Sequence, residues 1–451
     1  MINSGLKNGN SAEGVIPSSF TISEILITNC YGKQFDIKAL VTKTTIVESI
    51  YSFALTASLD IRDTVNLFEE IRISGQEKID IIIQKRDKGK KETVKVKLSF
   101  YVAEIPVYGK IKDAIQGYTL SCVARHAFAN HVTNISRAFS GSLSKQLQRI
   151  VSGDLDYNGV VENTAPSKGN VKLIIPNMKP FTAMSWLLRH AYSDSGAPIF
   201  AYDTMDGFKI VAYEKLTEQI SLGTYKFSFM QEDNPYTVEG FGEQKYKILN
   251  MASNLNSSKY IQSNRGAYSS LTKVIDISTK KYYEVPFDYS SQFRNTPKVS
   301  NGSMSNQLIS KEFKVKDQPL NLLHDSLNIF INENSMAMGN QYGNYHQPSV
   351  YSVAHHQSML ENLDSIKHTI TLNGDLELSA GSKISIQAPK SIDPQVYKKI
   401  KEKDSKKSHI NDMMISGDYL ITSVSHTFSN KYICELNIKR DFSNYNLDSA
   451  D

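Results

Sequence analysis

The chain has 451 residues, 40% of them hydrophobic and 22% charged, which suits a folded protein of about three domains. Its net charge of +5, from 51 basic and 46 acidic residues, is too small for a dedicated nucleic-acid binder, which concentrates a basic excess on one face. The cysteines Cys30, Cys122 and Cys434 lie far apart and form no CxxC pair. That spacing argues against a disulfide framework and a thiolate metal site, and it favours a reducing compartment.

The first segment, 1–19, is polar and is expected to be flexible. It has no apolar core of the kind that a signal peptide needs. No window of the sequence approaches the ~18 consecutive apolar residues of a membrane-spanning helix. We therefore expect a protein that is made and assembled in a cytoplasm, with no stable membrane association.

Residues 20–130 are predicted to form a first antiparallel β-barrel. Short apolar runs with partial alternation, the period of half-buried strands, recur from FTISEILITN to GYTLSCVARHAF. Only DTVNLFEE, residues 63–70, reads as a short helix, with Asp63 as its N-cap. A charged turn, KRDKGKKET, separates the strand EKIDIIIQK from the long strand that follows it. The block is therefore predicted to be almost entirely β.

Residues 131–231 change character and are predicted to form a small α+β domain. SLSKQLQRIV places its apolar residues at the helical period, and KPFTAMSWLLRHAYSDSG reads as a second helix with Thr182 as a possible cap. PIFAYDTMDGFKIVAYEKL then alternates on both sides of Asp206-Gly207, which is a strong hairpin signal. We expect a type I′ turn with Gly207 at positive φ.

Strand patterns return in 232–290 and 366–442, and together these segments are predicted to form a second β-barrel. Between them, 291–365 is rich in Ser, Asn, Gln and Gly and is expected to be a peripheral insertion. The Lys-rich stretch 390–412 is predicted to be a loop, and 443–451 a polar tail. The expected fold class is therefore mainly β, with two related barrels and an inserted α+β domain.

An internal repeat connects the two β blocks. SGQEKIDIII, residues 74–83, is similar to SAGSKISIQA, residues 379–388, and a charged loop follows each of them. Each loop leads to a strand, FYVAEIPVY or DYLITSVSHTF, and then to a strand that begins with tyrosine, YTLSCVAR or YICELNIKR. Such a match can arise by coincidence between two antiparallel sheets, or it can reflect a duplication. We favour the duplication.

Three segments resemble the central baseplate hub proteins of contractile-tailed phages, which share their fold with the hub half of the valine-glycine-repeat spike proteins of type VI secretion. The segments are LDIRDTVNLFEEIRISGQEKIDIII (59–83), RGAYSSLTKVIDISTKKYYEVPFDY (265–289), and GDLELSAGSKISIQAP (374–389) continued by SGDYLITSVSHTFSNKYICELNIKRDF (416–442). Each motif is weak alone because it reflects packing and turns. Their order along residues 20–445 carries the resemblance, from which the insertion 291–365 and the Lys-rich loop depart.

The resemblance implies a structural protein of the virion and not an enzyme. Hubs of this family form a homotrimer in which two barrels per subunit make a ring of near six-fold symmetry. The ring adapts the six-fold tail tube, or a tube initiator, above it to the three-fold central spike below it. It leaves a channel for genome ejection, and it can also contact baseplate wedge proteins. The alternatives are the hub of a bacterial contractile injection system and, in another class, a virion-associated cell-wall hydrolase.

The candidate chemical groups are weak, and we predict no catalytic, cofactor-binding or metal-binding residue. The histidine sets His126 with His131, and His355 with His356, lack the helical pairing of zinc hydrolases, and His355 and His356 would point to opposite faces of a strand. His426 is expected to be packed and hydrogen-bonded. The acids that could pair as in a glycosidase are Asp60, Asp63, Glu69 and Glu70, at the ends of the short helix. The basic loops 85–91 and 390–407 are expected to be solvated, or else to contact DNA transiently in the channel.

Overall fold

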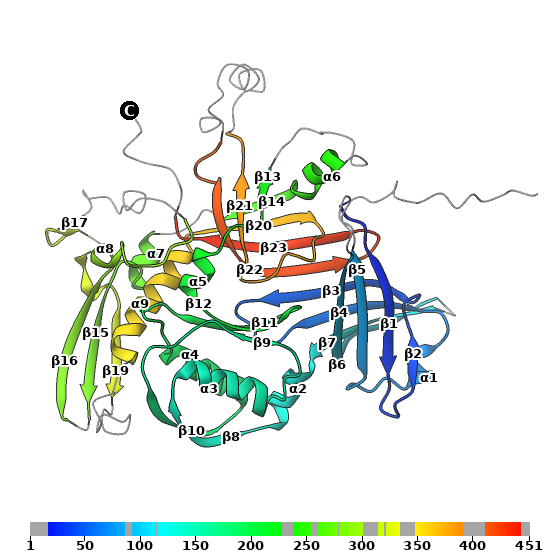
Figure 1. Ribbon diagram of the computed structural model, residues 1–451, viewed down its shortest axis with the longest axis horizontal. Coiled ribbons are helices and arrows are strands. Elements are labelled where there is room, and N and C mark those ends of the chain that lie inside the picture. The colour runs from blue at the N-terminus through cyan, green and yellow to red at the C-terminus, as the bar shows by residue number, and fades with distance from the viewer. Residues whose placement is uncertain are drawn as a thin grey trace, which may run out of the picture.

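The computed structural model shows a large curved sheet with an α+β domain against one side and a smaller lobe at one end (Figure 1). The residues that the structure describes are 17–85, 93–112, 115–227, 238–254, 259–277, 279–300, 314–319, 322–333, 348–390 and 411–442. The predicted tail 443–451 and most of the N-terminal segment and of the two basic loops lie outside this set.

A mainly antiparallel sheet of 13 strands runs through the molecule. Its neighbours follow in the order β14 (Ile248–Asn254), β20 (Ile366–Asn373), β23 (Tyr432–Arg440), β22 (Gly417–Phe428), β3 (Val41–Ser49), β4 (Thr56–Asp63), β7 (Ile115–Ala124), β6 (Val94–Lys112), β5 (Lys78–Lys85), β1 (Thr21–Thr28) and β2 (Gln34–Asp36). Two further strands, β21 (Lys383–Gln387) and β13 (Thr224–Lys226), extend the sheet from β22. The prediction of a mainly β fold is confirmed.

The strands form because their apolar residues alternate and so line one face. In β5 the residues Ile79, Ile81 and Ile83 are fully buried, and the residues between them are half-exposed. The buried faces of all the strands of the large sheet share one core, which also holds Leu120 of β7 and Leu436 of β23. The short helix α1 (Leu67–Ile71) covers one end of this core with Leu67 and Ile71.

The sheet consists of two halves with the same strand order. The first half runs β3-β4-β7-β6-β5-β1, and the second runs β14-β20-β23-β22-β21-β13. The halves differ in the direction of the last strand, because β1 is antiparallel to β5 whereas β13 is parallel to β21. The pairing of β5 with β6 begins at Lys78 with Tyr101, and that of β21 with β22 begins at Lys383 with Leu420. Lys78 and Lys383 hold the same position in the two similar sequence segments, 74–83 and 379–388. The register also shifts at matching places, between Val102 and Glu104 and between Ile421 and Ser423. A shared order and shared bulges support the duplication, because bulges are specific features that related sheets retain.

The halves are not separate sheets. Residues Ser423–Phe428 of β22 pair with Thr44–Ser49 of β3, so hydrogen bonding continues from the second half into the first. Within the second half an isolated bridge between Lys226 and Lys247 leads from β13 back to the start of β14. One sheet therefore joins the two halves that we predicted as separate barrels.

Between the halves in sequence lies the α+β domain. It contains α2 (Arg125–Val132), β8 (Ile135–Gly141), α3 (Leu143–Arg149), the π-helical turn Ile150–Asp154, β9 (Val161–Asn163), β10 (Val171–Met178), α4 (Pro180–His190), β11 (Ile199–Thr204), β12 (Gly207–Ala212) and α5 (Tyr213–Glu218). The helix faces predicted from sequence are buried, with Leu143 and Leu147 of α3 against Met184 and Leu187 of α4 in one core. The cap differs from the prediction: α4 begins at Pro180 with Lys179 as N-cap, because proline suits the first helical position.

The predicted hairpin is present, but its turn is of another type. Strands β11 and β12 pair from Ile199–Ala212 to Thr204–Gly207, so Met205 and Asp206 form the loop. Gly207 has φ +137°, as expected, whereas neither loop residue has the positive φ that a type I′ turn needs. A Cβ on Gly207 would lie 2.5 Å from the carbonyl oxygen of Val160, which accepts the N–H of Phe208. Close packing against β9 therefore requires glycine here.

Some strands that the sequence assigned to the second barrel belong to a separate lobe with its own sheet. Strands β15 (Ser269–Asp276) and β16 (Lys281–Asp288), which we assigned to the second barrel, form their own sheet with β19 (Asn328–Glu333). The lobe also contains α7 (Lys259–Asn264), α8 (Tyr289–Gln292), the short pair β17 (Lys314–Val315) and β18 (Gln318–Pro319), the 3-10 turn His324–Ser326 and α9 (Pro348–Leu363), while α6 (Val238–Lys245) precedes β14. Alternation shows that a segment is a strand, but it does not identify its neighbour.

The prediction that 291–365 is peripheral is wrong for helix α9. Its residues Met359 and Leu363 are buried in a core shared with Leu420 of β22 and with the α+β domain. The polar residues Ser358 and Asn362 are buried as well. Both side chains donate a hydrogen bond to the carbonyl of Ala267. The low apolar content of the segment hid a helix that buries polar residues, of which Ser358 and the amide NH2 of Asn362 find acceptors inside the protein.

Candidate functional site

The two halves of the sheet and the α+β domain meet at Glu48, on β3. Its side chain is 1% exposed. One carboxylate oxygen accepts the backbone N–H of Met205, in the hairpin of the α+β domain, at 2.8 Å. The other accepts the N–H of Ala380, in the second half of the sheet, at 2.9 Å. A single buried carboxylate therefore fastens three parts of the chain together.

Burial dominates the ionisation of Glu48. Removal from water raises its pKa to about 7, although the two amide donors favour the charged form. The charges of Asp206 and Lys209 act in opposite directions and contribute less. Glu48 is therefore expected to change its protonation state near neutral pH.

A second buried acid, Asp203 of β11, connects the first half of the sheet to the α+β domain. It accepts the phenolic O–H of Tyr157 at 2.8 Å and the backbone N–H of Leu55 at 3.2 Å. The ring of His126 lies 3.5 Å from the same carboxylate, and its Nε2 is 2.8 Å from the carbonyl of Phe53. Burial raises the pKa of Asp203. The group has an acid, a histidine and a tyrosine. Asp203 and His126 are buried and Tyr157 is half-buried, and all three are engaged in hydrogen bonds or close contacts that join the two parts.

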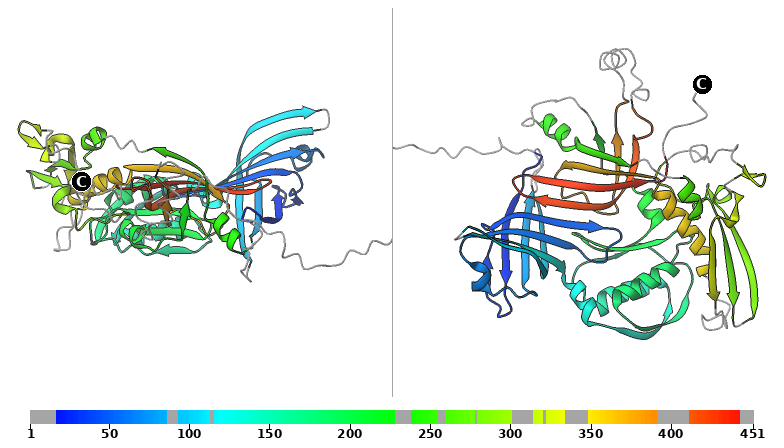
Figure 2. Two further views of the ribbon diagram at one scale, coloured as in Figure 1. Left: turned by 90° about the horizontal axis from the view of Figure 1, so that it is seen from above. Right: turned by 180° about the vertical axis from the view of Figure 1, so that it is seen from behind.

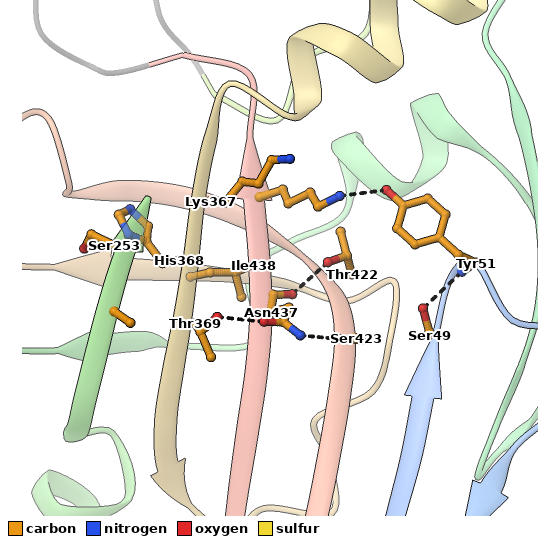
Figure 3. Close-up of a pocket in the computed structure, with 12 residues that line it drawn as sticks. Ser49, Tyr51, Ser253, Lys367, His368, Thr369, Thr422, Ser423, Asn437 and Ile438 are labelled. Carbon is orange, nitrogen blue, oxygen red and sulfur yellow. Dashed lines mark hydrogen bonds between the residues drawn. The ribbon is translucent and has the colours of Figure 1, made fainter. Parts of the chain in front are cut away.

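A groove of about 440 Å³ crosses the sheet from β14 over β20, β23 and β22 to the end of β3 (Figure 3). Its polar groups are paired with one another. Asn437 accepts Thr369 Oγ1 at 2.8 Å and donates to Ser423 Oγ at 2.9 Å. At one end, the ammonium groups of Lys367 and Lys439 both lie 2.7 Å from the carboxylate of Asp364.

The face of the sheet that carries this groove is polar and weakly charged across the junction of the halves. Cross-strand partners on this face form rows that pass from β20 to β4 without a break. The rows are Thr371–Glu435–Ser425–Val47–Thr56 and Asn373–Ile433–Thr427–Thr45–Ser58. Their side chains are exposed or half-exposed, and Glu435 is the one charged residue among them. Hydroxyl groups therefore dominate these two rows, while Lys367 and Lys439 lie at the groove end of the same face.

The predicted histidine candidates do not form a site. His131 is exposed at the end of α2, five residues from the buried His126. His355 and His356 lie on helix α9 and not on a strand, so the reason given for their divergence was wrong, although adjacent helical residues also point apart. Burial lowers the pKa of His356 to about 3, so it is neutral at ordinary pH.

His426 is buried and packed, as its sequence context suggested. Its Nδ1 lies 2.7 Å from the hydroxyl of Tyr432 and 3.3 Å from Cys434 Sγ. Burial lowers the pKa of His426 to about 3 and raises that of the Cys434 thiol to about 12. A neutral histidine and a protonated thiol make this pair chemically inert at neutral pH. Cys122 is buried too, Cys30 is exposed, and all three cysteines are free.

The predicted acid candidates serve local structure. Asp63 accepts the N–H groups of Val65 and Phe68, and Gln116 also donates to it. Burial raises the pKa of Asp63, but these donors outweigh it and hold the pKa below its usual value. The formal N-cap of α1 is Asn66, so Asp63 binds the first turn from three residues further back.

The remaining acids also show no glycosidase arrangement. Asp60 accepts Thr119 Oγ1 at 2.8 Å, and Glu69 accepts the side-chain amide of Asn66 at 2.7 Å. Glu70 is exposed to solvent. Within the part of the chain that the structure describes, no group of three or more His, Cys, Asp or Glu side chains could hold a metal ion. None of the helices in the described ranges is long and apolar enough to cross a membrane.

Sequence reasoning missed the two residues that join the parts of the molecule, Glu48 and Asp203. Glu48 stands in a strand pattern, on the apolar face of VTKTTIVES, where a charged residue breaks the alternation. Asp203 likewise interrupts the apolar run IFAYDT, all of which is buried. An acid on the inward face of a strand is the signal that could have identified both, because such a group must find donors.

No protein-family model matches the sequence, and no curated protein is significantly similar to it. The fold is similar to that of a tail protein from Neisseria meningitidis MC58, with a TM-score of 0.51 and 10% identity over 93% of this chain and 96% of that one. It is equally similar to the 43 kDa tail protein of prophage MuSo2 from Shewanella oneidensis, with a TM-score of 0.51 and 11% identity over 94% and 99% of the chains. The chain therefore has the fold of these tail proteins, which confirms the tail-protein fold that the sequence resemblance implied.

Proposed function

We propose that this chain, which has a phage tail-protein fold, is the structural hub subunit of a contractile tail baseplate. The observation that carries the proposal is the duplicated half-sheet, with one strand order and matching bulges in both halves. Three chains with two equivalent halves each present six similar edges, while the assembly keeps three-fold symmetry. Such a ring fits a six-fold tail tube, or its initiator, on one side and a trimeric spike on the other.

The polar face of the sheet is the surface that we propose lines the channel. DNA binds basic surfaces through its phosphates and is then held in a salt-dependent way. The rows that cross the junction carry Ser and Thr hydroxyl groups and a single charge, Glu435. A lumen of this composition would let a genome pass without retaining it. Contact with wedge proteins, and assembly in the host cytoplasm before incorporation in the virion, belong to the same proposal.

A role without catalysis is part of the proposal. The acids and histidines considered as catalytic groups are buried in structural hydrogen bonds or stand apart. Purified protein should release nothing from peptidoglycan or from model peptides. Turnover that one substitution, such as Asp60→Asn, abolishes would instead favour the wall-hydrolase alternative.

The stoichiometry of assembled particles tests the proposed hub. Quantitative mass spectrometry of purified tails should give three copies of this chain per particle, against multiples of six for the tube protein. Electron microscopy with an antibody fragment against the chain should label the baseplate centre. Six or more copies, or label along the tail shaft, would overturn the hub assignment and leave only a tail-protein fold. Recovery from a bacterial injection particle would support the related alternative.

A further inference from the structure

Strand β6 extends far beyond its neighbour β5. Pairing with β5 covers Val94–Tyr101, and among the described strands only β7 pairs with the rest of β6. The light-blue hairpin of β6 and β7 accordingly projects from the first half of the sheet (Figure 2, left). Its apolar residues are exposed, with Val107 at 60%, Tyr108 at 50% and Ile111 at 59%. Beyond Val102, the edge of β6 opposite β7 therefore faces none of the described strands, and exposed apolar side chains lie beside it.

Strand β14 ends the sheet on the other side. Over Asn250–Asn254, β20 is the only described strand that pairs with it. Ala252 and Ser253 are exposed, and Leu249, at the register shift, is 46% exposed. A long exposed edge with apolar residues is a ready template for pairing with another strand.

These two edges, which no other described strand covers, belong to the counterparts of strands that already pair inside the chain. In the repeat β6 corresponds to β22, and β14 corresponds to β3. Strands β22 and β3 form the junction between the halves, in antiparallel register from Ser423–Ser49 to Phe428–Thr44. The edge of β6 thus matches the edge of β22 at the junction, and the edge of β14 matches the edge of β3.

We propose that β6 of one copy pairs with β14 of the next copy and repeats the β22–β3 junction between chains. The partner is a second copy of this chain, and the inference rests on the proposed ring. A head-to-tail contact of this kind closes into a ring when the rotation per copy allows it. In the ring every half has a neighbour on both sides, so neither of the two edges remains exposed.

The repeat also sets the register of the proposed contact. When the β6–β7 pair is aligned with the β22–β23 pair, the cross-strand pair Val107–Thr119 corresponds to Ser425–Glu435. In this alignment Tyr108 corresponds to His426, and Lys110 corresponds to Phe428.

The β14–β20 pair aligns with the β3–β4 pair in the same way. Ser253, opposite His368, corresponds to Ile46, opposite Ala57. Met251, opposite Ile370, corresponds to Thr44, opposite Leu59. Since His426 faces Ile46 and Phe428 faces Thr44 inside the chain, Tyr108 should face Ser253, and Lys110 should face Met251, between chains.

Engineered disulfides test this register in the full chain. A disulfide needs Cβ atoms about 3.5–4.5 Å apart, which directly opposed strand residues approach and one-residue shifts do not. In a background with the exposed Cys30 replaced by serine, the matched pairs are Tyr108→Cys with Ser253→Cys, and Lys110→Cys with Met251→Cys. The mismatched control is Tyr108→Cys with Ala252→Cys, whose side chains point to opposite faces.

Mild oxidation at the highest soluble concentration should convert the matched variants into covalent dimers and trimers on non-reducing gels. A mixture of the Tyr108→Cys and Ser253→Cys single variants should stop at dimers, which distinguishes links between chains from links within one. Equal unfolding temperatures of the reduced variants and their parent show that the fold is kept.

Failure of both matched pairs, or equal linking by the mismatched control, overturns the strand pairing. Light scattering separates this result from failure of the proposed function. A trimer without matched links removes only the β6–β14 contact and leaves the ring, whereas links that build chains of more than three copies contradict the three-fold hub itself.

Discussion

The carboxylate of Glu48 accepts the backbone N–H of Ala380 at 2.9 Å, although 332 residues separate the two in sequence. Its second oxygen binds the N–H of Met205, so the loss of this side chain would loosen both the sheet junction and the contact with the α+β domain. Burial, which makes the contact effective, also raises the pKa of Glu48 to about 7.

The first prediction concerns the pH dependence of this contact. Because the folded pKa lies above the unfolded value of 4.5, the folded state binds the proton more tightly. The contribution of Glu48 is therefore fully present below pH 4.5 and is lost as the pH rises through about 7. The shift corresponds to roughly 3 kcal/mol in the free energy of unfolding.

Urea unfolding of the wild type and of Glu48→Gln between pH 4.5 and 8 measures the effect. The stability of the wild type relative to the variant should fall as pH rises. Groups common to both chains cancel in the difference. A difference that does not change with pH would show that Glu48 does not titrate in this range.

The second prediction concerns His426, whose pKa is shifted in the opposite direction to that of Glu48, so its effect on stability has the opposite pH dependence. Its folded pKa, lowered by burial to about 3, lies below the unfolded value of 6.5. Its contribution is present above pH 6.5 and is lost as the pH falls, by about 1.4 kcal/mol per pH unit. His426→Gln should flatten the decline in unfolding free energy from pH 6.5 to 4.5. His131→Gln, at an exposed position, is the matched control for the loss of one imidazole, and the slope of His426→Gln is compared with the slope of this variant.

The third prediction concerns Gly207. Alanine there would place its Cβ 2.5 Å from the Val160 carbonyl oxygen at a φ of +137°. Gly207→Ala should therefore destabilise the protein by about 1–3 kcal/mol. Gly153→Ala is the control, since a Cβ at Gly153 meets nothing within 4 Å and its φ is ordinary. Equal denaturation midpoints for the two variants would contradict the proposed strain.

The fourth prediction concerns helix α9. The amide of Asn362 donates to the carbonyl of Ala267 at 3.1 Å and to that of Ser358 at 2.9 Å. Asn362→Ala leaves the buried Ala267 carbonyl with one donor fewer and should cost about 1–3 kcal/mol in thermal or urea unfolding. Gln357→Ala, on the half-buried side of the same helix, should cost less than about 0.5 kcal/mol. If the two variants are equally stable, α9 does not belong to the core.

Local patterns in the sequence predicted many of the strands and the duplication, although they missed helix α9. Alternating apolar residues predicted β5, and the Asp206-Gly207 pair predicted the β11–β12 hairpin. The sequence alignment of Lys78 with Lys383 agrees with the strand pairing, which begins at these residues in the two halves. A strand and its bulge depend on short-range sequence, so this agreement could be predicted. The fold class followed from these features and from the order of the resembling segments.

The connections between distant segments depended on the tertiary structure. Alternation identifies the buried face of a strand but not the strand beside it, so the β22–β3 junction and the separate sheet of β15, β16 and β19 could not be read from sequence. Glu48 and Asp203 become structural ties only when remote backbone donors reach them in a space without water. Their pKa values likewise depend on burial by those segments, which no local pattern specifies.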